Sequence, residues 1–170
     1  MEPPIIKFLE SDDDVGISPV EKDLLEPIWK KLGEYTHRPK RRFPVSLPVS
    51  LDAYNVDRLN SADYVVTYKP SDSRRYLLYI DSEGKIYLED QRGYVFYVQA
   101  SRAIKLPSLD VEGFIKDTVL DGHFIRSSAE NEQQIDNNLV FSIQDAIRCN
   151  GFDLTNRGIS ERIDFIRVYL

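Results

Sequence analysis

The chain has 170 residues, 42% of them apolar and 29% charged, which is typical of one soluble globular domain. Its formal net charge of −6 argues against a protein that coats nucleic acid nonspecifically, because neutralising phosphates requires an excess of lysine and arginine. A pocket for a single nucleotide or one RNA end remains compatible with this charge.

The sequence carries no recognisable signal for export or for membrane insertion. No apolar run approaches the roughly 20 residues needed to cross a bilayer. The N-terminus lacks the basic start and the cleavage site of a secretory signal. Cys149 is the single cysteine, which excludes an internal disulfide. We therefore expect a nuclear or cytoplasmic protein with no membrane partner.

The first quarter of the chain has an uneven charge. Glu10–Asp14 is acidic, whereas His37–Arg42 is basic. The basic run has the composition of an RNA-facing arm or a nuclear import signal, although a solvated linker is the commoner meaning of such a run. We predict that residues 1–42 form an N-terminal arm with one helix and a basic segment, and that residues 43–170 form the folded domain.

Capping residues predict the helix of this arm. Ser18 is expected as the N-cap, Pro19 suits the first helical position and Glu21 completes a capping box. Gly33 is expected to end the helix. The predicted apolar face consists of Leu24, Leu25, Ile28, Trp29 and Leu32. We expect this face, including the single tryptophan, to pack in the core rather than on a purine.

The rest of the chain is predicted to be a meander of strands between two helices. Ser50 is expected to cap a second, short helix. The apolar positions of that helix are Leu51, Val56 and Leu59. Runs of β-branched and aromatic residues between turns predict strands at Tyr64–Lys69, Tyr76–Asp81, Lys85–Glu89, Tyr94–Val98, Thr118–Ile125 and Asn138–Ile147. The spacing of Ile159, Ile163, Ile166 and Leu170 predicts a closing helix.

A lysine at a strand end, followed by arginines, is a candidate for chemistry on a phosphate. A lysine amine attacks an α-phosphate only when it is deprotonated, and cations must neutralise the phosphates nearby. Lys69 ends a predicted strand, Arg74 and Arg75 follow it, and Asp121 lies on a later strand. These residues meet only if the sheet folds back on itself. Taken alone, such residues more often mark an ordinary strand exit into a polar turn.

Several segments, taken in chain order, resemble the nucleotidyltransferase domain of mRNA capping guanylyltransferases. They are Pro48–Leu51, Tyr64–Lys69, Arg75–Asp81, Val119–Gly122, Phe141–Asp145 and Glu161–Arg167. The resemblance covers most of residues 44–170. It implies an α+β fold, with an antiparallel sheet of about six strands and flanking helices, and no OB-fold lid. Residues 43–170 would then be a guanylyltransferase-like domain that binds a nucleotide or a cap.

The resemblance also implies roles for individual residues. Lys69 would match the lysine that takes up GMP in an active enzyme. Phe141 would stack on the guanine, which a flat aromatic ring does well. The other implied contacts are the phosphates for Arg74 or Arg75, the ribose or a metal for Asp121, and the floor of the base pocket for Asp145. Binding would need no cofactor, GMP transfer would need Mg²⁺ or Mn²⁺, and the few histidines and one cysteine predict no zinc site.

The chain departs from the family pattern at positions that matter for catalysis. The spacing from Lys69 to Asp72 is one residue longer than in the first motif, and the glycine that follows the aspartate is missing. His123 stands where the third motif has a glutamate. The sequence also stops before the later motifs and the lid that complete the active site in the family.

The cap-binding domain of snurportin is a second relative that fits these losses. It resembles the front half of guanylyltransferases, lacks catalysis and the lid, and binds a trimethylguanosine cap. A methylated base is held between two rings by cation–π attraction. The candidates for a second ring beside Phe141 are Tyr94, Phe96, Tyr97 and Trp29.

Three functions follow as hypotheses. The first is a catalytically degenerate guanylyltransferase-like domain that binds a guanine nucleotide or an RNA 5′ cap, with or without a protein partner. The second is a fragment or subunit of an active mRNA capping guanylyltransferase that transfers GMP through a lysine adduct. The third is a protein-interaction scaffold that binds no nucleotide.

Overall fold

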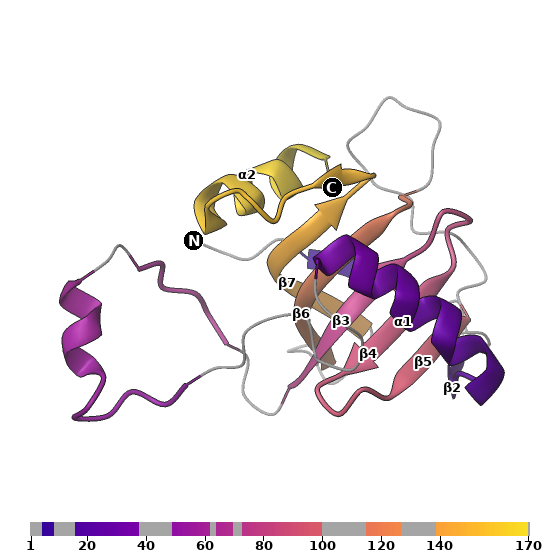
Figure 1. Cartoon of the computed structure of the whole chain (residues 1–170), viewed down its shortest axis with the longest axis horizontal. Coiled ribbons are helices and arrows are strands. Elements are labelled where there is room, and N and C mark those ends of the chain that lie inside the picture. Colours follow the sequence, from indigo (N-terminus) through magenta and orange to yellow (C-terminus); the bar gives the residue numbers. More distant parts are fainter. Residues whose placement is uncertain are drawn as a thin grey trace, which may run out of the picture.

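A computed structural model describes residues 5–8, 16–37, 49–61, 64–69, 73–99, 115–126 and 139–169. Within these residues an antiparallel sheet of eight strands is flanked by two α-helices, which confirms the predicted α+β class (Figure 1). The helical elements are α1 (Lys22–Thr36), the 3₁₀ helix η1 (Val56–Asn60) and α2 (Ile159–Tyr169). The strands are β1 (Ile5–Phe8), β2 (Gly16–Pro19), β3 (Arg74–Ile80), β4 (Ile86–Asp90), β5 (Val95–Gln99), β6 (Thr118–Arg126), β7 (Leu139–Cys149) and β8 (Phe152–Asp153).

The long strands form the middle of the sheet. The strand order is β1-β7-β6-β3-β4-β5-β2, and β8 pairs with the end of β7. The register between β6 and β7 shifts twice, between Val119 and Leu120 and again between Asp121 and Gly122. Each shift is a β-bulge that leaves one extra residue in β7. Beyond each bulge, the residues of β7 that point to a given face of the sheet change from odd to even positions or the reverse.

Both faces of the sheet are buried, each by one helix. Successive residues of a strand point to opposite faces, so neighbouring leucines of β3 serve different cores. Leu77 packs with Ile28 and Leu32 of α1, and Leu78 packs with Ile166 of α2. Figure 1 shows α1 lying across the sheet, with α2 beside β7. None of the described helices has the length and apolar character that a membrane span requires.

Five of the six predicted strands and the closing helix are confirmed. Strands β3 to β7 match their predicted ranges within two residues at each end. The predicted core role of Trp29 is also confirmed, because the indole packs against the cluster under α1. The strand predicted at residues 64–69 is wrong: these residues are exposed and irregular. A strand-forming composition is not sufficient where no neighbouring strand supplies backbone partners.

The predicted start and end of the first helix are also wrong. Ser18 lies in β2, where it pairs with Tyr97 of β5, and α1 begins at Lys22 with Glu21 as its N-cap. The helix continues through Gly33 to Thr36 and ends at His37, whose φ is 54°. Ser18 and Pro19, which the capping pattern predicted as the start of the helix, thus belong to the edge strand β2.

The predicted second helix is a single 3₁₀ segment without a buried face. Ser50 does not cap it; instead the Asp52 carboxylate accepts hydrogen bonds from the backbone N–H groups of Tyr54 and Asn55, at 2.9 and 3.1 Å. None of the residues in η1 is buried. The hydrophobic pattern therefore did not indicate a core contact within this chain.

Residues of the predicted N-terminal arm contribute to the sheet. β1 pairs with β7, β2 pairs with β5, and α1 covers one face. The Tyr35 hydroxyl donates a hydrogen bond to Asp117, and His37 Nε2 lies 2.7 Å from Asp153 Oδ2. Most of the basic segment, residues 38–42, lies outside the described residues, as does Leu170.

Candidate functional site

A group of polar side chains extends the sheet face that α1 covers. Arg75 precedes Leu77 and Tyr79 on the same face of β3, and His123 and Asp121 follow Val119 on the same face of β6. We call Ser73, Arg75, Asp121, His123, Ser142 and Asp145 the polar cluster. Asp121 and Asp145 are register partners, as are His123 and Ser142, so three strands contribute to it.

Arg75 and Asp121 form a bidentate ion pair in this cluster. Arg75 Nε lies 2.7 Å from Asp121 Oδ1, and Nη2 lies 2.5 Å from Oδ2. The side chains are 16% and 3% exposed. The hydrogen bonds that Arg75 donates to Asp121 raise the pKa of the guanidinium, whereas burial raises the pKa of the Asp121 carboxyl, although the hydrogen bonds and charge of Arg75 lower it. We regard the pair as ionised, because a forked guanidinium on a carboxylate is the strongest hydrogen-bond geometry available to either group.

His123 is a buried imidazole beside this pair. It is 6% exposed, and its Nδ1 lies 3.0 Å from Ser73 Oγ. Burial lowers the pKa of His123, and the positive charges of Arg75 and Lys69 lower it further, although Asp121 opposes them. His123 is therefore neutral at pH 7 and contributes no negative charge where the resemblance implied a glutamate.

Lys69 approaches the cluster from an exposed segment. Its positive charge is one of the influences that lower the pKa of His123. Thr67 Oγ1 donates a hydrogen bond to Gln144 Oε1 at 2.8 Å, and Gln144 Nε2 lies 3.4 Å from Ser142 Oγ. These bonds fix the path of the chain two residues before Lys69, so the lysine is held close to β7.

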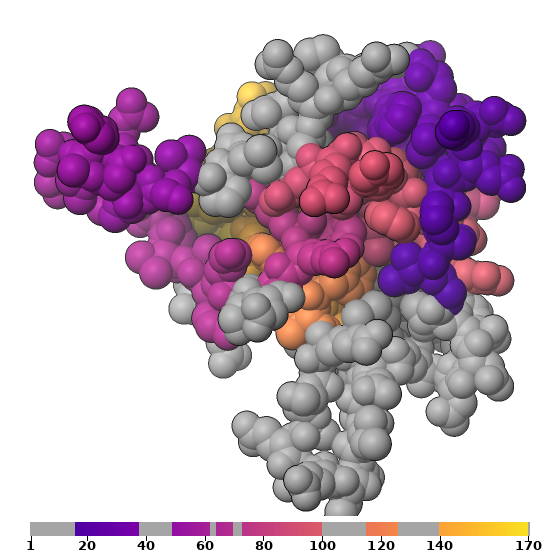
Figure 2. All heavy atoms as spheres, turned by 90° about the horizontal axis from the view of Figure 1, so that it is seen from below, coloured from indigo at the N-terminus to yellow at the C-terminus, as the bar shows by residue number. Residues whose placement is uncertain are grey.

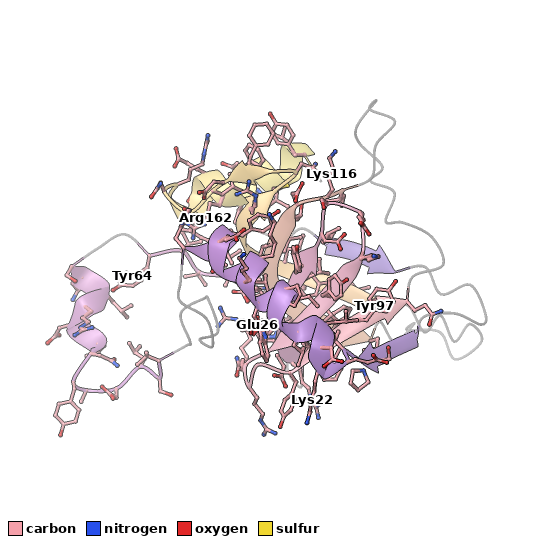
Figure 3. All side chains as sticks on the ribbon, turned by 45° about the vertical axis from the view of Figure 1, so that its right-hand side comes forward. Lys22, Glu26, Tyr64, Tyr97, Lys116 and Arg162 are labelled. Carbon is pink, nitrogen blue, oxygen red and sulfur yellow. The ribbon has the colours of Figure 1, made fainter. Side chains whose placement is uncertain are left out.

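Asp145 is also bound by α2, on which Figure 3 labels Arg162. Arg162 Nε and Nη2 donate to its two carboxylate oxygens at 2.7 and 2.8 Å. The charge of Asp145 also acts on Arg75 and Asp121. Sequence reasoning did not identify Arg162 or Ser73. An arginine on the buried side of the closing helix was the available signal for Arg162, and Ser73 offered none.

Two predicted site residues do not lie on this face. Phe141 is fully buried in the core under α2, and its ring centroid is 5.1 Å from that of Phe124. In this arrangement the ring presents no face to a base, contrary to the role that the resemblance implied. Arg74 is exposed and alternates with Arg75, so it extends the opposite face of β3. The structure thus brings Arg75, Asp121 and Asp145 together without Arg74 or Phe141, and Lys69 lies two residues beyond Thr67, which is bonded to Gln144 of β7.

The described carboxylates do not fit a resident metal ion. Asp121 and Asp145 are each occupied by an arginine fork. Among the described residues no group of three or more histidine, cysteine, aspartate and glutamate side chains is close enough to hold a metal. Any Mg²⁺ or Mn²⁺ that took part in GMP transfer would need ligands from beyond these residues.

Residues 12–169 match the family model described as mRNA capping enzyme, catalytic domain. Two curated relatives are similar to the chain, both named mRNA-capping enzyme. The protein from Danio rerio is 29% identical over 138 residues, which are 80% of this chain and 22% of that protein. The protein from Caenorhabditis elegans is 26% identical over 164 residues, which are 96% of this chain and 24% of that protein. The chain spans less than a quarter of the length of either relative.

Proposed function

Because the chain belongs to the family of mRNA capping enzyme catalytic domains, we propose that it binds a guanine nucleotide or an RNA 5′ cap at the polar cluster without completing GMP transfer itself. It would act as a pseudoenzyme in RNA processing, in the nucleus or cytoplasm, and its binding would require no resident metal.

The observation that carries this proposal is the Arg75–Asp121 pair beside Lys69. A guanidinium held by a buried carboxylate keeps its orientation, so little rotamer entropy is lost when a phosphate binds. Lys69, on the exposed segment that Thr67 bonds to β7, would supply a second cation. A largely buried guanidinium together with an exposed ammonium favours a polyphosphate, even in a chain with a net charge of −6.

Loss of catalysis is supported by residues of the same cluster. His123 is neutral where the resemblance implies a carboxylate, and Asp121 is already committed to Arg75. Asp145 is likewise bound by Arg162, so neither carboxylate of the cluster is free to hold a metal that bridges phosphates. Without that metal, the charge that develops during phosphoryl transfer is poorly stabilised.

The second candidate is a subunit or fragment of an active guanylyltransferase. The observation in its favour is the position of Lys69, whose charge reaches the cluster from a segment tied down by Thr67. In that case the remaining catalytic groups would come from other polypeptide.

Label transfer distinguishes these two candidates. The chain is incubated with α-labelled GTP and Mg²⁺ or Mn²⁺ and then resolved on a denaturing gel. We expect no covalent label. A labelled band that disappears in Lys69→Ala contradicts the pseudoenzyme and supports the second candidate.

Equilibrium binding tests the site itself. GTP, a 7-methylguanosine cap and a trimethylguanosine cap are titrated against the chain by calorimetry, which also ranks the cap methylation states. We expect Lys69→Ala and Arg75→Gln to weaken binding about tenfold each, as the loss of one phosphate contact predicts. Arg92→Gln, in the exposed turn after β4, is the matched control. Thermal unfolding shows whether Arg75→Gln is still folded, and failure of all three ligands to bind would favour the scaffold hypothesis.

A further inference from the structure

Two departures from the family motifs meet in the polar cluster. Ser73 directly follows Asp72, where the resemblance implied a glycine, and His123 stands where it implied a glutamate. The Ser73 hydroxyl oxygen lies 3.0 Å from His123 Nδ1, although the two residues are 50 positions apart in the sequence. The pairing of β3 with β6, which sets Arg75 opposite His123, brings them together. The two replacements therefore form one hydrogen-bonded unit, which we call the Ser73–His123 pair.

The Ser73–His123 pair lies close to the surface. Ser73 and Arg75 are only partly buried. β6 reaches the surface one residue beyond His123, because Phe124 is partly buried and Figure 2 shows orange atoms of β6 exposed on the main body. The pair is therefore within reach of the charge of a ligand that binds at Arg75.

The Ser73–His123 pair carries no charge at pH 7 and suits Mg²⁺ poorly. Burial is the largest of the causes that lower the pKa of His123, so its imidazole is neutral. Mg²⁺ prefers oxygen ligands, above all carboxylates, in an octahedral arrangement. An imidazole, and a hydroxyl that is hydrogen-bonded to it, do not supply such a set. A glutamate at position 123 would instead add a carboxylate on the same face of β6 as Asp121.

Both carboxylates of the polar cluster are already paired with arginines. Arg75 Nε lies 2.7 Å from Asp121 Oδ1, and Arg162 binds the two oxygens of Asp145 at 2.7 and 2.8 Å. A Mg²⁺ ion carried in on a triphosphate would therefore meet carboxylates whose charge is already neutralised. The guanidinium of Arg75 would repel the ion, and the ion would reduce the negative charge that the phosphates present to that guanidinium.

We propose that the polar cluster binds its phosphate ligand in the metal-free form, and that the Ser73–His123 pair determines this selectivity. The selectivity rests on the proposed function, because it requires that a guanine nucleotide or a cap binds at the cluster. Mg²⁺ would then oppose binding instead of supporting it, and the charge at position 123 would set the direction of the effect.

Calorimetric titration of the 170-residue chain with GTP and with the 7-methylguanosine cap tests the proposal. One series contains EDTA and the other contains excess Mg²⁺, at equal ionic strength, because salt alone screens the attraction between phosphates and cations. We expect GTP to bind at least about fivefold more weakly in Mg²⁺ than in EDTA.

His123→Glu should reverse the effect of Mg²⁺. The added carboxylate repels the metal-free triphosphate and gives a phosphate-bound Mg²⁺ an anchor beside Asp121. We therefore expect binding to be about tenfold weaker in EDTA and to recover in Mg²⁺. His123→Gln is the matched control, because glutamine has nearly the size of glutamate without its charge, and it should keep the preference for EDTA. Ser73→Asp adds the carboxylate at a partly buried position and gives the same readout if thermal unfolding shows that His123→Glu is not folded.

The outcomes separate this selectivity from the proposed function. Failure of GTP and the cap to bind in either series overturns both. GTP binding that Mg²⁺ strengthens or leaves unchanged in the unaltered chain overturns the selectivity alone. So does a response to Mg²⁺ that the folded carboxylate variants share with His123→Gln.

Discussion

Neighbouring residues of β6 point alternately toward the polar cluster and toward the core under α2. Asp121 and His123 face the polar cluster, and Gly122 between them lies against the opposite face. A Cβ atom on Gly122 would come within 2.3 Å of the Ser142 carbonyl oxygen and 2.8 Å of the Phe141 ring. The sheet can therefore bring its aromatic core this close to the cluster only because position 122 has no side chain.

Glu89 is a buried carboxyl in apolar surroundings. It is 8% exposed on β4, opposite Leu77 and Val95, which both belong to the core under α1. Desolvation raises the pKa of Glu89 from 4.5 to about 7, and the neighbouring charge of Asp90 adds to this shift. The folded protein thus holds a proton that the unfolded chain releases.

This shift predicts how stability depends on pH. Because the native pKa of Glu89 is raised, its contribution to stability is present below pH 4.5 and is lost as the pH rises to 7. Glu89→Gln should therefore raise the free energy of unfolding above pH 7 by up to about 3 kcal/mol. Below pH 4.5 the gain should shrink. Urea unfolding at both pH values checks this, and an equal effect at the two would contradict the assigned cause.

At the scale of elements, α2 is attached to the sheet by both packing and an ion pair. Ile166 is fully buried against the core, and Arg162 binds Asp145 of β7 through two nitrogen atoms. Phe165 and Tyr169 stack at 4.2 Å along the same helix. The helix is therefore fixed in rotation as well as in position.

Arg162→Lys tests the fork. Lysine keeps the charge but cannot donate two parallel hydrogen bonds to Asp145, so we expect a loss of about 1–2 kcal/mol in stability. Amide exchange in α2 should speed up as well. Arg167→Lys is the control, because Arg167 lies 3.7 Å from Asp164, which is 69% exposed. Equal losses in the two variants would mean that the fork is not what holds the helix.

Sequence patterns were sufficient for the elements whose neighbours lie within this chain. β3 to β7 were predicted because alternating or continuous apolar runs match strands buried on both faces. Residues 64–69 have the same composition but pair with no strand in the described part of the chain, and a strand requires a partner that composition cannot reveal. Ser18 and Pro19 form a good helix start in isolation, yet pairing with β5 satisfies the same backbone groups.

The candidate site was predictable in part for a similar reason. Lys69, Arg75 and Asp121 were identified because motif order constrains them, and the structure pairs Arg75 with Asp121 in the polar cluster. The burial of Phe141 depends on which face of the sheet its side chain points to. The two register shifts between β6 and β7 change which residues of β7 point to each face. Bulges leave no clear trace in a single sequence, so the orientation of Phe141 and Asp145 could not be deduced.

At the scale of the whole molecule, the two cores share one sheet. Ile28 belongs to the core under α1, and Ile143 belongs to the core under α2. Since β3, β6 and β7 contribute residues to both cores, unfolding of one core disrupts the strands against which the other core packs. We therefore expect both cores to unfold in a single transition.

Two probes test this cooperativity. Trp29 fluorescence reports on α1, and far-ultraviolet circular dichroism reports on the sheet and both helices. Ile28→Ala and Ile143→Ala should each lower the free energy of unfolding by about 2–4 kcal/mol. The unfolding midpoint should therefore fall by the same amount in both signals. If Ile28→Ala shifts the fluorescence transition alone, α1 and its core form a separate unit.

Early and late segments of the sequence pair in the finished sheet. β1 pairs with residues 139–142 of β7, and His37 contacts Asp153 across 116 positions of sequence. During synthesis, β1 therefore lacks this partner until β7, about 130 residues later, has been made. Until then its apolar residues remain accessible to chaperones or to misassembly.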